Sequence, residues 1–478
     1  MSLSFLSIEE LHTGLKARTF TCRELITDCL ECIKEKDGEI HAFLSVYPEQ
    51  ALKLADAVDK KIQASEKIGL LEGIPFSVKD VILVEDMRAT GGSKMLEPFI
   101  APYDATVIKR LKEVGAIVIG KTNCDAYGFG SSTENSDFGV TKNPHDLSKV
   151  AGGSSGGSAA SVAAGMCVFS LGEDTGGSIR QPSAFCGIYG LKVSYGRVSR
   201  YGSIAYASSF DSIGPMARST RDVAIVLSVI AGKDSMDHTS IPGLVPDYIA
   251  ELKATELKSK RIGIPKEYFS GLDATMTKII NNALDTFKKE GYEIVEISLP
   301  HTKYAIAAYY LLVTSEASSN LARLDGVRFG YQAPDPTSIE DLYKRSRSHG
   351  FGPEVKRRVM LGSFALSSGY IDAYYKRAQK VRTLIREDFR KAFETVDLII
   401  TPTSPFPAFT IGEKVNDPMT MYLADVFTVG FSLAGLPTIN VPCGTMEHLP
   451  VGMQITAPYL DETSVLQAAS VFEQAHHK

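Results

Sequence analysis

The chain has 478 residues, of which 44% are hydrophobic and 22% are charged, and its net charge is −5 at neutral pH. This composition is ordinary for a globular protein and provides enough apolar residues to shield an active site from water. The negative net charge argues against a chain that grips nucleic acid alone, because phosphate binding depends on many Lys and Arg contacts.

The sequence contains no segment that predicts a membrane span or a secretion signal. No apolar run approaches the roughly 18 residues that a spanning helix needs. The first ten residues include acidic side chains and lack a basic, apolar leader. We therefore expect a cytoplasmic protein that makes no contact with a membrane.

The seven cysteines do not form a metal-binding or disulfide framework. Cys29 and Cys32 make a single C-x-x-C pair inside a helical pattern, and no second pair follows at the spacing of a zinc site. We expect reduced thiols and no metal ion in this chain.

The predicted elements alternate between helices and strands. Two capping boxes, Ser7 with Glu10 and Thr21 with Glu24, each predict the start of a helix. The other expected helices cover 49–63 and 105–114, the expected strands cover 74–79, 116–120, 167–171, 262–264 and 398–401, and 303–394 is mostly helical. This alternation indicates the α/β class.

We expect one domain over residues 1–478, because no repeat, low-complexity tract or linker divides the chain. Within it, helices occupy about 1–65, the segments with the chemical motifs lie in about 66–230, and a helical region follows at about 303–394.

The most informative stretch contains two glycine-rich motifs, Gly-Gly-Ser-Ser-Gly-Gly-Ser at 152–158 and Asp-Thr-Gly-Gly-Ser-Ile-Arg at 174–180. A flexible linker is one interpretation of the first motif, but the glycines run directly into an apolar helix and a strand. A phosphate-binding loop is another, yet the Gly-Lys-Ser/Thr and G-x-G-x-x-G patterns are both missing.

The second motif fits a nucleophilic serine. Gly176 and Gly177 allow a sharp turn before Ser178 and can aim successive N–H groups at one point, as an oxyanion hole requires. A serine also needs a base. None of the nine histidines lies in either motif, so the base is a distant histidine or a lysine that burial keeps neutral. The spacing alone does not choose between them.

These motifs resemble the amidase signature family. The resemblance implies an α/β fold with a central mixed β-sheet covered by helices on both faces. It also implies a Ser-cisSer-Lys triad in which Ser178 is the nucleophile, Ser154 the bridging serine and Lys79 the base at the end of a strand. The oxyanion hole would be formed by the backbone N–H groups of Thr175, Gly176, Gly177 and Ser178.

Within the family, segments 315–323, 350–358 and 361–370 are similar to those of the glutamine-hydrolysing A subunits of tRNA-dependent amidotransferases. The resemblance implies that Arg358 binds the α-carboxylate of glutamine, that Asp425 binds its α-ammonium group, and that Tyr309 completes the site. Asp125-Ala126-Tyr127 and Val193-Ser194 depart from the expected pattern, and the first departure falls near the substrate site.

The resemblance predicts hydrolysis of glutamine through an acyl-ester on Ser178. The ammonia would pass to a heterotrimer with subunits B and C, in which the partner subunit uses ATP and Mg²⁺ to amidate Glu-tRNA(Gln) or Asp-tRNA(Asn). This chain itself would hold no cofactor. Two alternatives are a free-standing amidase acting on small amides, which segments 315–323 and 350–358 oppose, and a non-catalytic scaffold subunit, which the intact triad opposes.

Overall fold

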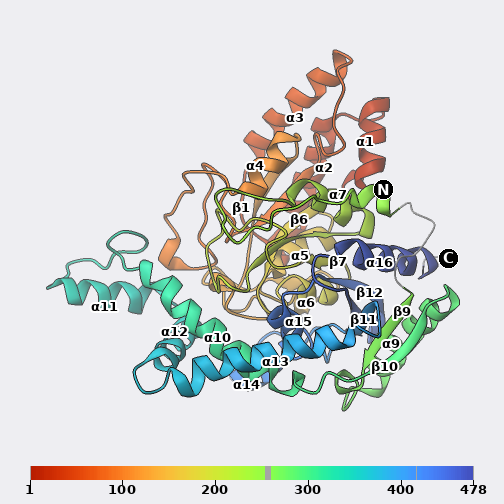
Figure 1. Ribbon diagram of the computed structural model, residues 1–478. Coiled ribbons are helices and arrows are strands. Elements are labelled where there is room, and N and C mark those ends of the chain that lie inside the picture. Colours follow the sequence, from red (N-terminus) through yellow and green to blue (C-terminus); the bar gives the residue numbers. More distant parts are fainter. Residues whose placement is uncertain (1, 253–259, 416, 477–478) are drawn as a thin grey trace.

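A large mixed sheet forms the centre of the computed structural model, which describes residues 2–252, 260–415 and 417–476 (Figure 1). Its 11 strands lie in the order β1-β3-β2-β6-β8-β7-β12-β13-β11-β9-β10. In chain order they are β1 (Phe43–Val46), β2 (Pro75–Lys79), β3 (Ile117–Thr122), β6 (Phe169–Asp174), β7 (Tyr189–Lys192), β8 (Ser212–Ala217), β9 (Arg261–Pro265), β10 (Glu293–Ile297), β11 (Leu398–Pro402), β12 (Thr438–Met446) and β13 (Leu449–Thr456).

Parallel and antiparallel pairs both occur in the sheet, so the predicted α/β class and mixed sheet are confirmed. Strands β3, β2 and β6 are parallel, as are β10, β9 and β11, whereas β6, β8, β7, β12, β13 and β11 are joined by antiparallel pairing. A separate hairpin pairs β4 (Lys142–Asn143) with β5 (Asp146–Val150).

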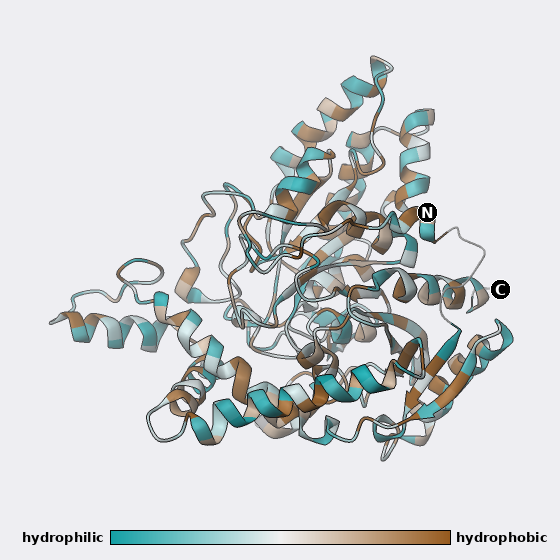
Figure 2. Cartoon of the chain, in the orientation of Figure 1, coloured by the Kyte–Doolittle hydropathy of each residue, from teal (hydrophilic) through white to brown (hydrophobic). Residues whose placement is uncertain are grey.

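Helices surround this sheet, and the brown apolar positions of Figure 2 gather where helices and strands meet. Both predicted capping boxes are present, at the starts of α1 and α2. None of the helices within the described ranges is long and apolar enough to cross a membrane. The helices are α1 (Ile8–Ala17), α2 (Cys22–Ile40), α3 (Pro48–Gln63), α4 (Thr106–Glu113), α5 (Gly156–Ala163), α6 (Arg180–Phe185), α7 (Thr220–Ile230), α8 (Tyr248–Glu251), α9 (Ala274–Lys289), α10 (Ala305–Asn320), α11 (Ile339–Gly350), α12 (Pro353–Leu366), α13 (Arg377–Ala392), α14 (Pro418–Tyr422), α15 (Val429–Ala434) and α16 (Glu462–His476).

The pairing of β2 with β6 positions the chemical motifs. Phe76 pairs with Phe169 and Val78 with Leu171, and the two phenylalanine rings stack with centroids 4.9 Å apart. Because the strands are parallel, their carboxyl ends reach the same edge of the sheet. Lys79, the last residue of β2, therefore lies next to the loop that follows β6.

The helical region predicted over 303–394 packs as a layer of its own at one side of the sheet, where α10, α12 and α13 run together and α11 projects outward (Figure 1). Helices α10 and α12 approach closely at Gly362, where any Cβ would overlap the carbonyl group of Thr314. This layer carries Tyr309 on α10 and Arg358 on α12 toward the edge that holds Lys79.

Candidate active site

The loop between β6 and α6 is folded around the carboxylate of Asp174. Asp174 Oδ1 accepts a hydrogen bond from the Gly177 N–H at 2.8 Å, and Oδ2 accepts one from the Ile179 N–H at 3.1 Å. Arg180 Nε donates to Oδ2 at 3.0 Å, and both side chains of this pair are fully buried. Burial alone would raise the pKa of Asp174, but Arg180 and the N–H donors outweigh it and lower that pKa. Asp174 therefore stays ionised and fixes the turn that presents Ser178.

Gly177 occupies a conformation that favours glycine, with a φ of +146°. A Cβ there would also meet the side chain of Thr428. Gly177 is one of the four predicted oxyanion donors, but its N–H group donates to the carboxylate of Asp174. To stabilise an oxyanion, this N–H group would have to break that hydrogen bond.

The structure brings Lys79, Ser154 and Ser178 to one place. Lys79 Nζ lies 2.8 Å from Ser154 Oγ, and these side chains are deeply buried. The Ser155 N–H donates to the carbonyl oxygen of Ser178 at 3.1 Å, which holds the two serine segments side by side. The peptide bond between Gly153 and Ser154 is cis. Ser178 is 8% exposed and is the least buried of the three residues.

Sequence reasoning missed an acidic partner of Lys79. Glu173 accepts from Lys79 Nζ through its backbone carbonyl at 3.2 Å and lies 3.3 Å away through its Oε2. Burial raises the pKa of the Glu173 carboxyl, while the neighbouring Lys79 opposes that shift. The available signal was a second acidic residue beside Asp174 at the end of β6, a strand otherwise built from apolar and small residues.

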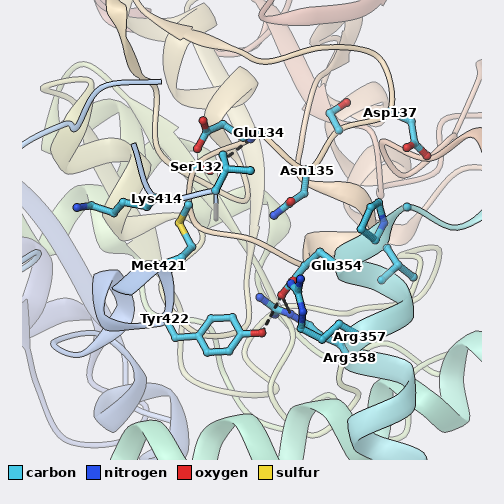
Figure 3. A pocket seen from close by; sticks show the side chains of 15 residues that line it. Ser132, Glu134, Asn135, Asp137, Glu354, Arg357, Arg358, Lys414, Met421 and Tyr422 are labelled. Carbon is cyan, nitrogen blue, oxygen red and sulfur yellow. Dashed lines mark hydrogen bonds and ion pairs between the residues drawn. The ribbon is translucent and has the colours of Figure 1, made fainter. Parts of the chain in front are cut away.

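Arg358 is buried among hydrogen-bond partners and aromatic rings. Its Nε donates to Glu354 Oε1 at 2.8 Å, one helical turn earlier on α12, and its Nη1 donates to the Tyr206 hydroxyl at 2.6 Å. The hydroxyl of Tyr422 also donates to Glu354 at 3.0 Å, and Figure 3 shows the side chains of Arg358, Glu354 and Tyr422 converging. Four aromatic rings have their centroids 5.2–5.9 Å from the guanidinium carbon, namely those of Phe129, Tyr206, Tyr310 and Tyr422.

Asp425 ends the short 3₁₀ helix η8 (Leu423–Asp425), and the residue is 7% exposed. Oδ2 accepts from the Ser131 hydroxyl at 2.8 Å and from the Tyr310 hydroxyl at 3.1 Å. Burial raises the pKa of Asp425 to about 7, against these two hydrogen bonds. A cationic group placed beside this carboxyl would therefore be needed to keep it fully ionised at neutral pH.

Tyr309 links the helical layer to residues 175–179, the loop between β6 and α6 that carries Ser178 and is called the serine loop below. It is buried on α10, and its hydroxyl lies so close to Gly176 that a Cβ at that position would overlap it. Of the three residues predicted to bind glutamine, Tyr309 borders this loop, while Arg358 and Asp425 both contact Tyr310, with the ring centroid 5.2 Å from the guanidinium carbon and the hydroxyl 3.1 Å from Asp425 Oδ2.

A pocket of about 270 Å³ leads from the surface to Arg358 (Figure 3). Several residues of its lining are charged, including Glu134, Asp137 and Lys414. The full lining consists of Ser132, Glu134, Asn135, Ser136, Asp137, Gly352, Pro353, Glu354, Val355, Arg357, Arg358, Lys414, Val415, Met421 and Tyr422. Arg358 belongs to this lining, whereas Ser178 does not.

Asp125, in the first segment that departs from the family pattern, lies close to the same part of the structure. The carboxylate of Asp125 accepts from the N–H groups of Thr133 at 2.9 Å and Asn135 at 3.0 Å. It thereby shapes the loop that carries Ser131, the hydrogen-bond donor to Asp425. In the second departure, the Ser194 N–H donates to the buried carboxylate of Glu462, away from Lys79.

The structure thus places a serine at a glycine turn, a second serine and a buried lysine next to one another. The family comparison agrees with this arrangement. The model of the Amidase family matches residues 24–466, and the chain belongs to this family. The resemblance expected from the sequence is confirmed.

Three individual proteins show how similar the chain is to particular relatives. The chain is 52% identical over 470 residues to the A subunit of the glutamyl-tRNA(Gln) amidotransferase of Chromohalobacter salexigens, covering 98% of this chain and 96% of that protein. The crystal structure of the protein of the same name from Thermotoga maritima is similar with a TM-score of 0.82 and 39% identity, covering 98% and 95% of the two chains. A peptide amidase from Stenotrophomonas maltophilia has the same TM-score at 28% identity, covering 98% and 96%.

Proposed function

We propose that this chain is the glutamine-hydrolysing subunit of a tRNA-dependent amidotransferase. The observation that carries the proposal is the 2.8 Å hydrogen bond from Lys79 to Ser154 directly beside the serine loop. The full-length similarity to the A subunits of amidotransferases supports glutamine as the substrate. The buried cation of Arg358 and the buried acid of Asp425 are complementary to the two charged ends of a free amino acid.

In the proposed reaction, Ser178 Oγ attacks the carboxamide carbon of glutamine. Its proton passes to the Ser154 hydroxyl while the Ser154 proton passes to neutral Lys79, whose Nζ lies 2.8 Å from Ser154 Oγ. The N–H groups of Thr175, Gly176, Gly177 and Ser178 are the candidates to stabilise the oxyanion, and Gly177 would leave Asp174 to do so.

Collapse of the intermediate releases ammonia and leaves a γ-glutamyl ester on Ser178. Lys79 returns its proton through Ser154 to the leaving nitrogen, and a water molecule then attacks the ester by the same relay. The products are glutamate and ammonia, and the serine is regenerated.

The ammonia is proposed to reach partner subunits B and C, which complete a cytoplasmic heterotrimer. There, ATP and Mg²⁺ activate Glu-tRNA(Gln), or Asp-tRNA(Asn), for amidation. The net charge of −5 supports this division, because this chain is poorly suited to bind tRNA by itself. We also propose that residues 1–478 form a single domain around the one continuous sheet.

The test compares glutaminase activity of the chain alone with that of the complex reconstituted with its partner subunits and tRNA. Ser178→Ala should abolish glutamine hydrolysis while ammonium-driven amidation continues, since removal of a nucleophile typically costs several orders of magnitude in turnover. Ser464→Ala, at a buried serine on α16, is the control and should stay active.

Two results would contradict the proposal. Labelling of Cys124 or Cys186, rather than Ser178, by a glutamine-analogue electrophile would reject the serine mechanism. Faster hydrolysis of simple aliphatic amides than of glutamine, unchanged by partners, would favour a free-standing amidase.

A further inference from the structure

Glu173 is a buried acid next to the proposed base, and the mechanism above gives it no role. Its side chain is 1% exposed, Lys79 is 0% exposed, and Oε2 lies 3.3 Å from Lys79 Nζ. The other carboxylate oxygen, Oε1, is buried without a hydrogen-bond partner among the described residues. Lys79 is therefore the main polar contact of this carboxyl group.

The other ionisable groups around Glu173 do not replace Lys79 as its partner. Asp174 is paired with Arg180, and Arg200 lies 3.9 Å from Asp237. Asp211 accepts hydrogen bonds from Thr175 Oγ1 and from backbone N–H groups, and burial raises its pKa well above the usual value. Burial likewise raises the pKa of the Cys124 thiol, so it stays neutral. Lys79 is the cation in direct contact.

The contacts of Lys79 match the hydrogen-bonding capacity of its amino group. An ammonium group has three N–H donors, and Nζ has three acceptors, which are Ser154 Oγ, the Glu173 carbonyl and Glu173 Oε2. A neutral amine has two donors and one lone pair. When both N–H groups point at the two oxygens of Glu173, the lone pair faces Ser154, as proton transfer requires.

We propose that Glu173 is a positioning residue whose carbonyl oxygen and Oε2 accept the two N–H groups of neutral Lys79 and so turn the lysine lone pair toward Ser154. This inference rests on the proposed function, because it assigns Glu173 a role in that relay.

The charges of Glu173 and Lys79 determine the direction in which removal of the acid should shift the pH profile. An ionised Glu173 attracts positive charge at the neighbouring amino group, so it opposes the loss of a proton from the relay. Opposite charges in direct contact at a buried site interact strongly. Removal of the carboxylate should therefore move the acid limb of the pH profile to lower pH by about one unit or more.

The experiment uses Glu173→Gln in the reconstituted complex, which keeps the size of the side chain and removes its titration. The readout is the rate at which a glutamine-analogue electrophile labels Ser178 as a function of pH, because labelling needs the base but not product release. A downward shift of the acid limb supports the proposal. An unchanged or upward-shifted limb overturns it.

Glu462→Gln is the matched control, since this acid is also fully buried but pairs with Arg197. Its acid limb should coincide with that of the unchanged protein even if its unfolding temperature falls. Should Glu173→Gln fail to fold, Glu173→Asp retracts the carboxylate, and a smaller downward shift is expected, while no shift overturns the proposal. Labelling that persists in Ser178→Ala would instead refute the proposed function itself.

Discussion

The hydroxyl group of Thr428 donates a hydrogen bond to the backbone carbonyl of Gly176, at a distance of 2.5 Å. The same hydroxyl lies 3.1 Å from the carbonyl oxygen of Asp425. One buried side chain thus joins the loop of the proposed nucleophile to the segment that carries the proposed binding site for the α-ammonium group.

Arg180 extends this connection into the sheet. Its Nη1 donates to the carbonyl of Thr428 and to Gln454 Oε1 on β13, both at 3.0 Å, and its Nη2 donates to Ser432 on α15 at 2.9 Å. These contacts explain how residues far apart in the sequence keep a fixed geometry. A displacement of the serine loop should therefore disturb both chemistry and substrate binding.

Gly176→Ala tests the close approach of the serine loop to α10. The added methyl group would overlap the Tyr309 hydroxyl and push the loop away. We expect kcat/KM for glutamine to fall by on the order of 100-fold, since misplacement by about 1 Å can cost that much. Gly38→Ala, in α2 with open space around it, is the control and should be as active and slightly more stable. Wild-type kinetics in Gly176→Ala would show that the loop tolerates movement.

Lys79→Arg tests the base. A guanidinium group stays protonated, so it cannot accept the proton from Ser154, and glutamine hydrolysis should be lost at every pH. Lys121→Arg is the matched control, because Lys121 is equally buried and pairs with Asp80 at 2.9 Å outside the relay. It should keep glutaminase activity even if it unfolds at a lower temperature. Turnover retained by Lys79→Arg would point to a histidine base.

The sequence predicted the elements that carry strong local signals. The capping boxes located α1 and α2, and alternation of apolar residues located β2, which ends at Lys79 as expected. The long hairpin of β12 and β13, which contributes Gln454 to the hydrogen bonds of Arg180, was not predicted, and neither was the order of the strands. Strand order depends on packing between distant segments, which local periodicity does not encode.

The candidate site likewise combines residues that a local motif indicated with residues that only distant packing brings together. Ser178 and its glycines form one local motif, so the residues themselves indicated a nucleophile. Lys79, Arg358 and Asp425 lie on other elements, and only the family resemblance selected them. The contacts of Glu173 with Lys79 and of Tyr206 with Arg358 arise from tertiary packing, and no spacing in the sequence predicts them.

Asp425 should make glutamine binding depend on pH. Its pKa is raised to about 7, so below that pH the carboxyl becomes neutral and no longer balances the α-ammonium group of glutamine. KM for glutamine should rise as pH falls through about 7. Asp425→Asn should have a high KM that varies little over this range. Ser131→Ala removes a hydrogen-bond donor to Asp425 but keeps the titrating carboxyl group, so its KM should still depend on pH. A KM of the unchanged protein that does not depend on pH would contradict the assignment.

The same raised pKa has a consequence for stability. In the unfolded chain Asp425 would titrate near its ordinary value of about 3.9, whereas the folded protein retains the proton up to about pH 7. Because the folded state binds more protons between these values, the contribution of Asp425 to stability decreases as pH rises through this window. Thermal unfolding without glutamine should show this trend, and Asp425→Asn should weaken it.

Arg358→Ala tests whether the buried guanidinium binds the α-carboxylate of glutamine. A charge-assisted hydrogen bond contributes about 1.5–3 kcal/mol, so KM for glutamine should rise by roughly one to two orders of magnitude. Amidation of Glu-tRNA(Gln) driven by added ammonium should change little, because it bypasses glutamine. Lys356→Ala is the matched control, since this cation on the same helix donates to the backbone carbonyl of Ser348 and lies outside the pocket lining, so its KM should stay near that of the unchanged protein. Equal loss of both routes in Arg358→Ala, accompanied by a lower unfolding temperature, would mean that the Arg358–Glu354 pair supports the fold rather than the substrate.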